Sequence, residues 1–527
     1  MRRALSLLFP RQRTHWHLEA DDDRPDHRAK GGAISVSEAL GAAVVETHSG
    51  VVFFFGDRAY KVKKAVDLGF LDFSTREARE AACHREVELN RRLAPDVYLG
   101  VADVLDPSGA LCDHLVVMRR MPADRRLSTL VTAGEPLVDH LRHLAHLVAT
   151  MHDRSPRSDA ADAAASADAQ HARWCANTAT LIDDAGRIFD EGTIALVHGL
   201  ASRYIGGREV LFADRIARGR ACDGHGDLLT DDIFCLEDGP RALDCLEFDD
   251  QLRLGDGLAD VAFLAMDLER LGRVDLAASF LAAYQEYAGD HWPQSLADHY
   301  IAYRAQVRAK VEGIRADQGD PAAGGRARAL LDLAASRLEA ARVRLVLVGG
   351  RPGTGKSTLA LGAGAATGAV VLRSDEVRKE LAGIPTSSPA PAGYREGIYT
   401  PAAAVDTYHR MLTLADIALR HGETVILDAS WSDARWRDRA RLMAGADRAD
   451  VVELRCTAPA PLASERLLAR AAAGGDSSDA SPAVAAAMAA AEDPWPTATA
   501  IDTARDPASS SADVVEHITR RVAPVAA

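Results

Sequence analysis

Residues 350–357 have the types and the spacing that hold a chain of phosphates. They follow an apolar run, 345–348, and match the pattern GxxxxGK[ST] at every fixed position. The glycines allow backbone N–H groups to converge on phosphate oxygens, Lys356 is expected to reach the outer phosphates, and the Ser357 hydroxyl is expected to bind Mg²⁺. A helix that begins directly after the loop would place its positive end beneath the anion. The stretch therefore predicts a binding site for ATP and Mg²⁺. The residues expected to hold the nucleotide are Gly350, Arg351, Pro352, Gly353, Thr354, Gly355, Lys356, Ser357 and Thr358.

Two carboxylates follow apolar runs that are typical of strands in the same sheet. Asp375 comes after residues 369–372, and Asp428 ends the run that begins at residue 423. Ligands of an open α/β sheet lie at the carboxyl ends of its strands, so both side chains are expected to face the phosphate loop. Asp428 would contact Mg²⁺ through water, and Asp375 would act as a base or position the acceptor. An N-cap role for Asp375 is compatible with this prediction.

A later helix carries two arginines that suit a lid over the nucleotide. Arg466 and Arg470 are four residues apart on one helix face, and small polar residues follow at 471–482. Residues 344–527 resemble the gluconate kinase, zeta toxin and polynucleotide kinase group, in which lid arginines approach the phosphates on closure. The resemblance implies a phosphoryl-transfer site. Its catalytic residues would be Lys356, Asp375, Arg466 and Arg470.

A second set of residues that could do chemistry lies between residues 222 and 262. His225, Gly226 and Asp227 are followed five residues later by Asp232, and then by a turn and a strand, ALDCLEF, that ends in acids. Transfer of a phosphoryl group to a hydroxyl requires such a set. One carboxylate accepts or orients the acceptor proton, while others hold Mg²⁺ on the ATP phosphates.

This region resembles the aminoglycoside phosphotransferase and choline kinase group of kinase-like folds, over about residues 51–303. The match is to HGDxxxxN, to an apolar–acid–aromatic strand end, and to a GDxxxDxA tail. The resemblance implies that Asp227 is the catalytic base and that Asp260 is a structural acid beneath the catalytic loop.

The chain departs from this family pattern at the metal ligands. Asp232 stands where the family has Asn, so it can still bind Mg²⁺ but adds a negative charge. The remaining metal ligand is either Glu247, which fits the apolar–acid–aromatic pattern, or Asp249, which has the more usual residue type. The spacing leaves both open.

The element that must hold the nucleotide phosphates in this first domain is a strand within residues 42–64. Lys61 and Lys63 share one face of that strand, and a capping pattern at 74–77 opens a helix with Glu86 near its centre. In kinase-like small lobes a strand lysine pairs with phosphates and a helix glutamate holds the lysine. Lys61 and Glu86 are therefore expected at the nucleotide, with Lys63 as the alternative to Lys61. A solvated edge strand would also account for both lysines.

The length of 527 residues is too great for one core and fits several domains. A break rich in Gly, Pro and Asp at 315–326 marks the main boundary. The predicted fold class is an α+β kinase-like bilobal domain followed by an α/β P-loop domain with a mostly parallel sheet. The predicted divisions are an N-terminal tail at 1–40, an aminoglycoside phosphotransferase-like domain at 41–320, a linker helix at 321–343 and the P-loop domain at 344–527.

Composition limits the classes of partner. A net charge of −14 disfavours general binding to nucleic acid or to anionic membranes. No apolar stretch approaches the ~18 residues of a membrane-spanning helix. The seven cysteines form no CxxC pair, which indicates reduced thiols and a cytoplasmic protein. The expected partner is a small hydroxylated substrate.

The order of the two domains resembles bacterial proteins described as bifunctional phosphotransferase and ATP-binding proteins. The resulting prediction is an ATP-dependent small-molecule kinase with two nucleotide-binding domains, which transfers the γ-phosphoryl group to a hydroxyl. One alternative is a regulatory ATP-binding protein or ATPase in which one domain is catalytically weak. Another is a toxin-like or polynucleotide-end kinase.

Overall fold

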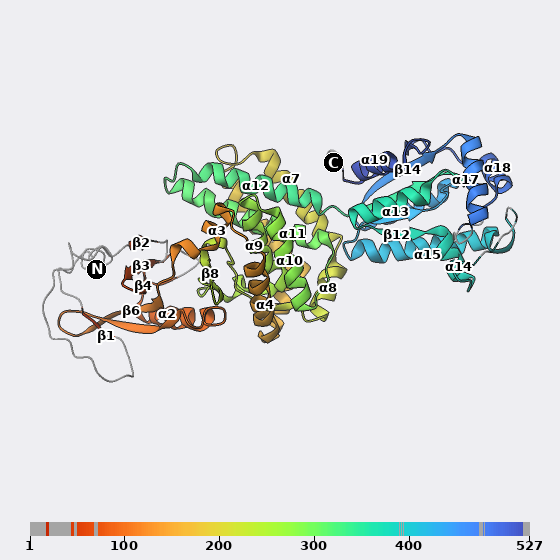
Figure 1. The fold of residues 1–527 in the computed structure, drawn as a ribbon. Coiled ribbons are helices and arrows are strands. Elements are labelled where there is room, and N and C mark those ends of the chain that lie inside the picture. The colour runs from red at the N-terminus through yellow and green to blue at the C-terminus, as the bar shows by residue number, and fades with distance from the viewer. Residues whose placement is uncertain are drawn as a thin grey trace. The chain divides into compact units, whose positions relative to one another are not determined.

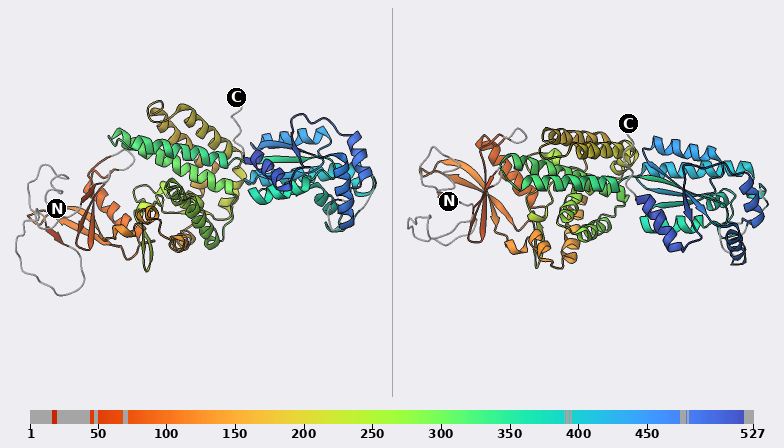
Figure 2. Two further views of the ribbon diagram at one scale, coloured as in Figure 1. Left: turned by 45° about the horizontal axis from the view of Figure 1, so that its top comes forward. Right: turned by 90° about the horizontal axis from the view of Figure 1, so that it is seen from above.

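The structure is a computed structural model that describes residues 17–19, 44–46, 50–67, 72–388, 390, 393, 395–473, 478 and 480–519. The chain forms two compact units. Figures 1 and 2 show the helices and strands of the chain from three sides. Unit 1 comprises Met1–Ala165 and Gly219–His291, and unit 2 comprises Ser166–Arg218 and Trp292–Ala527. This division differs from the predicted one, because the helices of residues 166–218 and 292–340 belong to the same unit as the P-loop. The predicted tail at 1–40 lies outside the described residues, except for a strand at His17–Glu19.

An antiparallel six-stranded sheet forms one side of unit 1, in the order β1-β5-β6-β4-β3-β2 among the described residues. Its strands are β1 (His17–Glu19), β2 (Val44–Glu46), β3 (Gly50–Phe55), β4 (Arg58–Lys63), β5 (Tyr98–Leu105) and β6 (Leu111–Arg119). Helix α2 (Arg76–Asn90) begins after the N-cap Thr75, whose side chain accepts a hydrogen bond from the backbone N–H of Ala78 at 3.2 Å. It packs on β5 and β6. Strand β4 pairs with β3 and β6, so its lysines lie within the sheet and not at an edge.

The rest of unit 1 is mostly helical. Its elements are η1 (Ala123–Arg125), α3 (Leu127–Ala133), α4 (Val138–Arg154), α5 (Asp159–Ala165), β7 (Ala221–Asp223), η2 (Thr230–Asp232), β8 (Ile233–Leu236), β9 (Gly239–Ala242), η3 (Asp250–Leu252), β10 (Leu254–Asp256), α9 (Gly257–Arg270) and α10 (Val274–Ala288). Helix α9 is buried along nearly its whole length, and α4 packs on α10. The loop between β7 and η2 carries Asp227 and rests on α9.

Unit 2 contains a group of helices and a parallel sheet. The helices are α6 (Ala167–Asp183), α7 (Glu191–Gly206), α8 (Glu209–Ala217), α11 (Gln294–Asp317) and α12 (Ala323–Ala340). Helices α11 and α12 form an antiparallel pair that contacts α6 and α7. The core of this group includes Trp174 and His299, both with 0% of their surface exposed.

The sheet of unit 2 has five parallel strands in the order β12-β13-β11-β14-β15 among the described residues. The strands are β11 (Arg344–Gly349), β12 (Val370–Arg373), β13 (Val425–Asp428), β14 (Asp450–Thr457) and β15 (Thr499–Asp502). The helices are α13 (Lys356–Thr367), α14 (Ser374–Leu381), α15 (Pro401–Arg420), α16 (Ala434–Ala446), α17 (Ala460–Ala473), α18 (Pro482–Ala490) and α19 (Pro507–Thr519), with a short η4 (Gly397–Tyr399).

Helices cover both faces of this parallel sheet (Figure 2). Helices α13 and α19 contact each other on one face, and α15 and α16 contact each other on the other. Every residue of the central strand β11 is buried, and its residues 345–348 form a continuous apolar run, as expected for a strand covered on both faces. The predicted fold class is confirmed: a kinase-like α+β domain precedes an α/β P-loop domain. Within the described residues, no helix combines the length and the apolar character needed to cross a bilayer.

Candidate functional sites

The phosphate loop lies between β11 and α13, as the sequence predicts. Gly350, Gly353 and Gly355 have φ values of 137°, 81° and 84°, which side chains other than glycine rarely adopt. A Cβ atom at Gly350 would lie 2.7 Å from the backbone oxygen of Cys456, so glycine is also needed for space. Lys356 is the first residue of α13, and Gly355 is its N-cap. The loop conformation is therefore built into the sequence, and the helix N-terminus faces the space that phosphates would fill.

Asp428 lies beside this loop at the end of β13, opposite Val348 in the neighbouring strand β11. One carboxylate oxygen, Oδ2, accepts a hydrogen bond from Arg373 Nε at 3.4 Å. The other, Oδ1, is buried and has no hydrogen-bond partner among the described residues. Burial raises the pKa of Asp428, and the nearby Lys356 and Ser357 partly offset that effect. A buried carboxylate oxygen without a partner, next to Ser357, fits a Mg²⁺ ion held directly or through water.

Asp375 is placed at the start of α14, close enough to Asp428 to help raise its pKa. Its carboxylate forms an ion pair with Arg378. The guanidinium of Arg378 lies 4.7 Å from the ring centre of Tyr399, which restricts it further. The structure thus brings Asp375 to the Asp428 side of the loop, with its side chain held by Arg378. Its catalytic role stays a prediction.

The two arginines that the sequence predicts for a lid, Arg466 and Arg470, have different surroundings. Arg466 donates to the backbone oxygen of Thr503 at 2.7 Å, and the Thr503 hydroxyl donates to the backbone oxygen of Thr354 in the phosphate loop at 2.7 Å. Arg466 therefore lies next to the loop. Arg470 instead donates to the backbone oxygen of Ala480 at 3.4 Å, in the segment that follows α17. Its approach to the phosphates stays a prediction.

In unit 1, one carboxylate, Glu86, holds both lysines of β4. Lys61 Nζ lies 2.9 Å from Glu86 Oε1 and 2.6 Å from Asp244 Oδ1. Lys63 Nζ lies 2.5 Å from Glu86 Oε2 and also pairs with Glu247. The side chain of Lys63 is 0% exposed, whereas Lys61 reaches Asp244, whose side chain is 52% exposed. Lys61 therefore faces the open side of the site, and Lys63 lies behind it.

The electrostatics of this cluster favour charged side chains. Burial lowers the pKa of Lys61, but Asp244 and Glu86 outweigh that effect and leave it raised. Burial raises the pKa of Glu86, but the two lysines outweigh that effect and leave it lowered. Lys61 and Glu86 accordingly form the lysine–glutamate pair that the sequence predicts, and both side chains stay charged. The contact of Lys61 with a nucleotide stays a prediction.

Helix α9 holds the loop that carries Asp227 in place. Asp260 accepts the backbone N–H of His225 through Oδ2 and that of Gly226 through Oδ1, each at 2.8 Å. A Cβ atom at Gly224 would lie 2.6 Å from Asp260 Cγ, so the loop can approach α9 this closely only with glycine there. Asp260 has the structural role that the resemblance implies. Asp227 projects from a loop whose backbone is fixed by a buried carboxylate.

Three carboxylates share the space at the end of this loop. Burial raises the pKa of Asp232 well above its usual value, and Asp244 and Asp227 raise it further. Asp244 is a residue that the sequence analysis missed. It follows the first apolar pair of ALDCLEF, and its φ of 64° turns the chain into the site. The predicted strand ALDCLEF is wrong beyond its first residue, because β9 ends at Ala242. The signal that could have found Asp244 is that it is the first acid after this shorter strand, ahead of the two candidates that were chosen.

Those two candidates, Glu247 and Asp249, are engaged elsewhere. Glu247 pairs with the buried Lys63, and Asp249 caps η3 by accepting the backbone N–H of Gln251 at 2.9 Å. Neither is among the main groups that raise the pKa of Asp232. The described residues contain no cluster of three His, Cys, Asp or Glu side chains arranged for a metal. Mg²⁺ usually takes only one or two carboxylates besides substrate phosphates, and Asp232 and Asp244 fit that requirement.

The chain is similar to a family of known domains and to a mycobacterial protein. Residues 345–494 match the model of a family described as an AAA domain. The uncharacterized protein Rv2004c of Mycobacterium tuberculosis is 44% identical over 498 residues, which span 94% of this chain and 99% of the relative.

Solved structures are similar to parts of the chain. A gluconokinase from Sinorhizobium meliloti is 16% identical, with a TM-score of 0.26, and the match covers 34% of this chain and 92% of that one. A choline/ethanolamine kinase family protein from Mesorhizobium loti is 15% identical, with a TM-score of 0.35, and the match covers 58% of this chain and 95% of that one.

Proposed function

The chain belongs to the same family as the mycobacterial protein Rv2004c, and we propose that it is an ATP-dependent phosphotransferase that uses a hydroxyl of a small molecule as acceptor. The proposal includes two nucleotide-binding domains, each with Mg²⁺. The observation that carries it is the phosphate loop, in which Lys356 and Ser357 begin α13 beside the partnerless Oδ1 of Asp428. Kinase-like folds in both parts of the chain support a phosphotransferase. The hydroxyl acceptor is inferred from the carboxylates at each site.

In the P-loop domain, the protein's own groups would position the reactants and neutralise charge. Lys356 and the N-terminus of α13 would hold the phosphates, and Ser357 with Asp428 would hold Mg²⁺. Bound ATP·Mg²⁺ would supply the phosphoryl group. Asp375, oriented by Arg378, would accept or orient the acceptor proton. Arg466 would exclude water and stabilise negative charge from the lid side.

In the kinase-like domain, phosphate binding, Mg²⁺ binding and positioning of the acceptor would depend on residues of an antiparallel sheet and of the loop on α9. Lys61, held by Glu86, would bind phosphates, and Asp232 with Asp244 would hold Mg²⁺. Asp227 would orient the acceptor hydroxyl. Its loop is already fixed by Asp260, so little reorganisation would be needed.

One observation favours a second candidate, in which the kinase-like domain binds nucleotide but transfers little. Asp232 is half-buried close to Asp244 and Asp227, and desolvation together with repulsion from these two carboxylates raises its pKa well above the usual value. A family Asn at this position would bring no such charge. Under this proposal, the first domain would report nucleotide binding while the P-loop domain performs the transfer.

The test is a phosphotransfer assay of the full chain with radiolabelled ATP and a broad panel of sugars, aminoglycosides and nucleosides. We expect a phosphorylated product. Lys356→Ala should lower its rate by about 10²–10³-fold, the scale seen when one charge-stabilising group is removed from a transferase site. Asp227→Ala should lower any activity of the first domain by a similar factor. Arg435→Ala is the matched control, because Arg435 is exposed and its one ion pair within the described residues is with the nearby Asp433.

The outcomes separate the proposals. If Lys356→Ala lowers the rate of product formation and Asp227→Ala does not, phosphoryl transfer is assigned to the P-loop domain. That result supports the second candidate, in which the kinase-like domain binds nucleotide but transfers little. Phosphate release without any labelled product across the panel contradicts the transferase proposal. Equal activity of wild type, Lys356→Ala and Asp227→Ala contradicts both proposed sites.

A further inference from the structure

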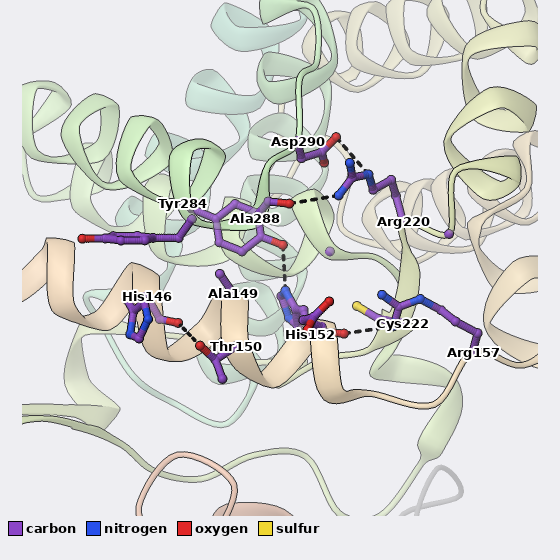
Figure 3. A pocket seen from close by; sticks show the side chains of 14 residues that line it. His146, Ala149, Thr150, His152, Arg157, Arg220, Cys222, Tyr284, Ala288 and Asp290 are labelled. Atoms are coloured by element: carbon purple, nitrogen blue, oxygen red, sulfur yellow. Dashed lines mark hydrogen bonds and ion pairs between the residues drawn. The ribbon is translucent and has the colours of Figure 1, made fainter.

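A polar pocket of about 250 Å³ lies in unit 1, between α4, α10 and the first turn of α9 (Figure 3). Its floor is made of buried residues, among them His152, Cys222 and Tyr284. Exposed residues such as Arg157 stand at its rim. The volume corresponds to about eight water molecules, or to a small metabolite, at roughly 30 Å³ for each water. None of the residues assigned to nucleotide or acceptor lines it.

Two arginines gather at one end of the pocket, beside Cys222 (Figure 3). Arg220 is already held: its Nε lies 3.2 Å from Asp290 Oδ1, and its Nη1 donates to the backbone oxygen of Ala288 at 3.1 Å. Arg157 pairs with no carboxylate among the described residues. Its Nη1 donates only to the backbone oxygens of His152 and Ser155, at 2.9 and 2.7 Å. Arg157 therefore contributes a positive charge that no carboxylate of the described chain balances.

Most of the carboxylates near the pocket already have a partner. Asp290 pairs with Arg220, Asp260 pairs with His152, and Asp256 caps α9 by accepting the backbone N–H of Leu258 at 2.9 Å. Asp153 and Arg157 are both exposed, so solvent and salt screen both of these charges. An oxyanion that enters the pocket would meet the Arg157 guanidinium, which can bind it through two parallel hydrogen bonds.

The floor of the pocket connects directly to the catalytic loop. His152 Nε2 lies 2.9 Å from Asp260 Oδ2, and His152 Nδ1 lies 2.8 Å from the Tyr284 hydroxyl. The same carboxylate of Asp260 holds the backbone N–H groups of His225 and Gly226. A Cβ atom at Gly257 would lie 2.7 Å from the Tyr284 hydroxyl, so the first turn of α9 packs closely against the Tyr284 side chain. A ligand that restrains His152 and Tyr284 would thereby also restrain the loop of Asp227.

We propose that this pocket is a regulatory site for a small molecule with a phosphate or carboxylate group, bound by Arg157 and Arg220 and coupled through His152 and Asp260 to the Asp227 loop. The regulatory part rests on the proposed role of Asp227. The binding part does not, because it concerns a cavity outside the nucleotide and acceptor groups. The shared chemistry of the ligand is its oxyanion, and two probes distinguish phosphate from carboxylate.

The test is hydrogen–deuterium exchange of the full chain, with and without inorganic phosphate at constant ionic strength. We expect slower exchange of the backbone amides in residues 149–157 and 219–222, and of the His225 and Gly226 amides. If phosphate binds only the closed form, a phosphate concentration ten times Kd should lower the population of the locally open form, and therefore the exchange rate of these amides, about tenfold. The amides of residues 350–357 provide an internal control, since the phosphate loop should also bind the probe. A second arm replaces phosphate with acetate and reports a carboxylate preference.

In Arg157→Ala, phosphate should no longer slow amide exchange in unit 1, but it should still slow the exchange of the amides in residues 350–357. Arg154→Ala is the matched control, because Arg154 is an exposed arginine of the same segment outside the pocket lining, and it should behave as wild type. The binding site is contradicted if phosphate still slows the exchange of the amides in residues 149–157 and 219–222 in Arg157→Ala. It is also contradicted if neither phosphate nor acetate slows their exchange in the wild type. Slowing at 149–157 and 219–222 without any at His225 and Gly226 overturns the coupling. The readout needs no turnover, so a failed phosphotransfer assay would leave it interpretable.

Discussion

Two lysines of strand β4, Lys61 and Lys63, have different surroundings although they are two residues apart. Lys61 bridges Glu86 to the exposed Asp244, whereas Lys63 bridges Glu86 to Glu247 with no exposed surface. The same carboxylate is therefore held by one lysine that can reach a ligand and by one that cannot. Because Lys63 is also paired with Glu86, Glu86 would keep a partner if Lys61 turned to the phosphates of a bound nucleotide.

Replacing each lysine by methionine should separate these roles. Lys63→Met leaves Glu86 and Glu247 buried with one cation too few, and should cost about 3–5 kcal/mol of the stability of unit 1. Lys61→Met leaves Glu86 paired with Lys63, and should cost about 1 kcal/mol while it weakens nucleotide binding to this domain. Urea titration followed by hydrogen exchange of the α2 amides measures the first effect. Nucleotide titration of a Lys356→Ala background measures the second. The reverse order of stabilities would contradict these assignments.

A buried histidine in unit 2 should make its stability depend on pH. His299 Nε2 accepts a hydrogen bond from Trp174 Nε1 at 3.3 Å, and burial lowers the pKa of His299 from 6.5 to about 3. A histidine with a depressed folded pKa contributes stability that is complete above its unfolded pKa and is lost as the pH falls below it. For His299 the window runs from 6.5 down to about 3.

The expected loss between pH 8 and pH 5 from this one group is about 2 kcal/mol. His299→Gln removes the titration and should flatten the pH dependence by that amount, although it also changes the absolute stability. Urea unfolding followed by tryptophan fluorescence at the two pH values gives the comparison. An unchanged difference between pH 8 and pH 5 in His299→Gln would rule out this histidine as the source.

Helix α17 packs directly on the phosphate loop. A Cβ atom at Gly353 would collide with the backbone oxygen of Ala463 near the start of α17, and the φ of Gly353 is 81°. The loop and the helix that carries the lid arginines therefore fit together only with glycine at this position. The same packing keeps Arg466 next to the loop through Thr503.

Gly353→Ala should displace α17 and weaken ATP binding by about tenfold or more, since the strain of a non-glycine residue here is on the order of 1–3 kcal/mol. The control is Gly445→Ala in α16, where an added Cβ meets nothing within 4 Å. That variant should keep wild-type affinity and gain about 0.5–1 kcal/mol of stability from helix propensity. Isothermal titration with a non-hydrolysable ATP analogue checks both. Equal affinities would show that α17 does not constrain the loop.

At the scale of the whole molecule, the chain carries two sites of different architecture. The site of unit 1 combines a lysine of an antiparallel sheet with a loop held on α9, and that of unit 2 uses the carboxyl ends of a parallel sheet. The chain leaves unit 1 after Ala165 and returns to it at Gly219. A single cut in the sequence therefore cannot divide the units as their packing does, and point variants such as Lys356→Ala and Asp227→Ala isolate the sites better than fragments would.

The sequence by itself was sufficient for the parts of each site that are contiguous in the chain. Residues 350–357 form the predicted loop because its conformation depends on glycines and on the helix that directly follows. The acid-ended strands of the second domain were readable for the same reason, since a parallel sheet sends every strand end to one edge. The fold class followed from such local patterns.

The tertiary structure alone decided which distant side chains meet. It placed Lys61 at the open side of the site and Lys63 behind it, and it put Asp244, not Glu247 or Asp249, beside Asp232. It also brought Arg157 and Arg220 to one pocket from segments some sixty residues apart, 157 and 220. The physical reason is that a local motif constrains its own backbone, whereas burial, charge pairing and cavity shape depend on segments that become neighbours only on folding.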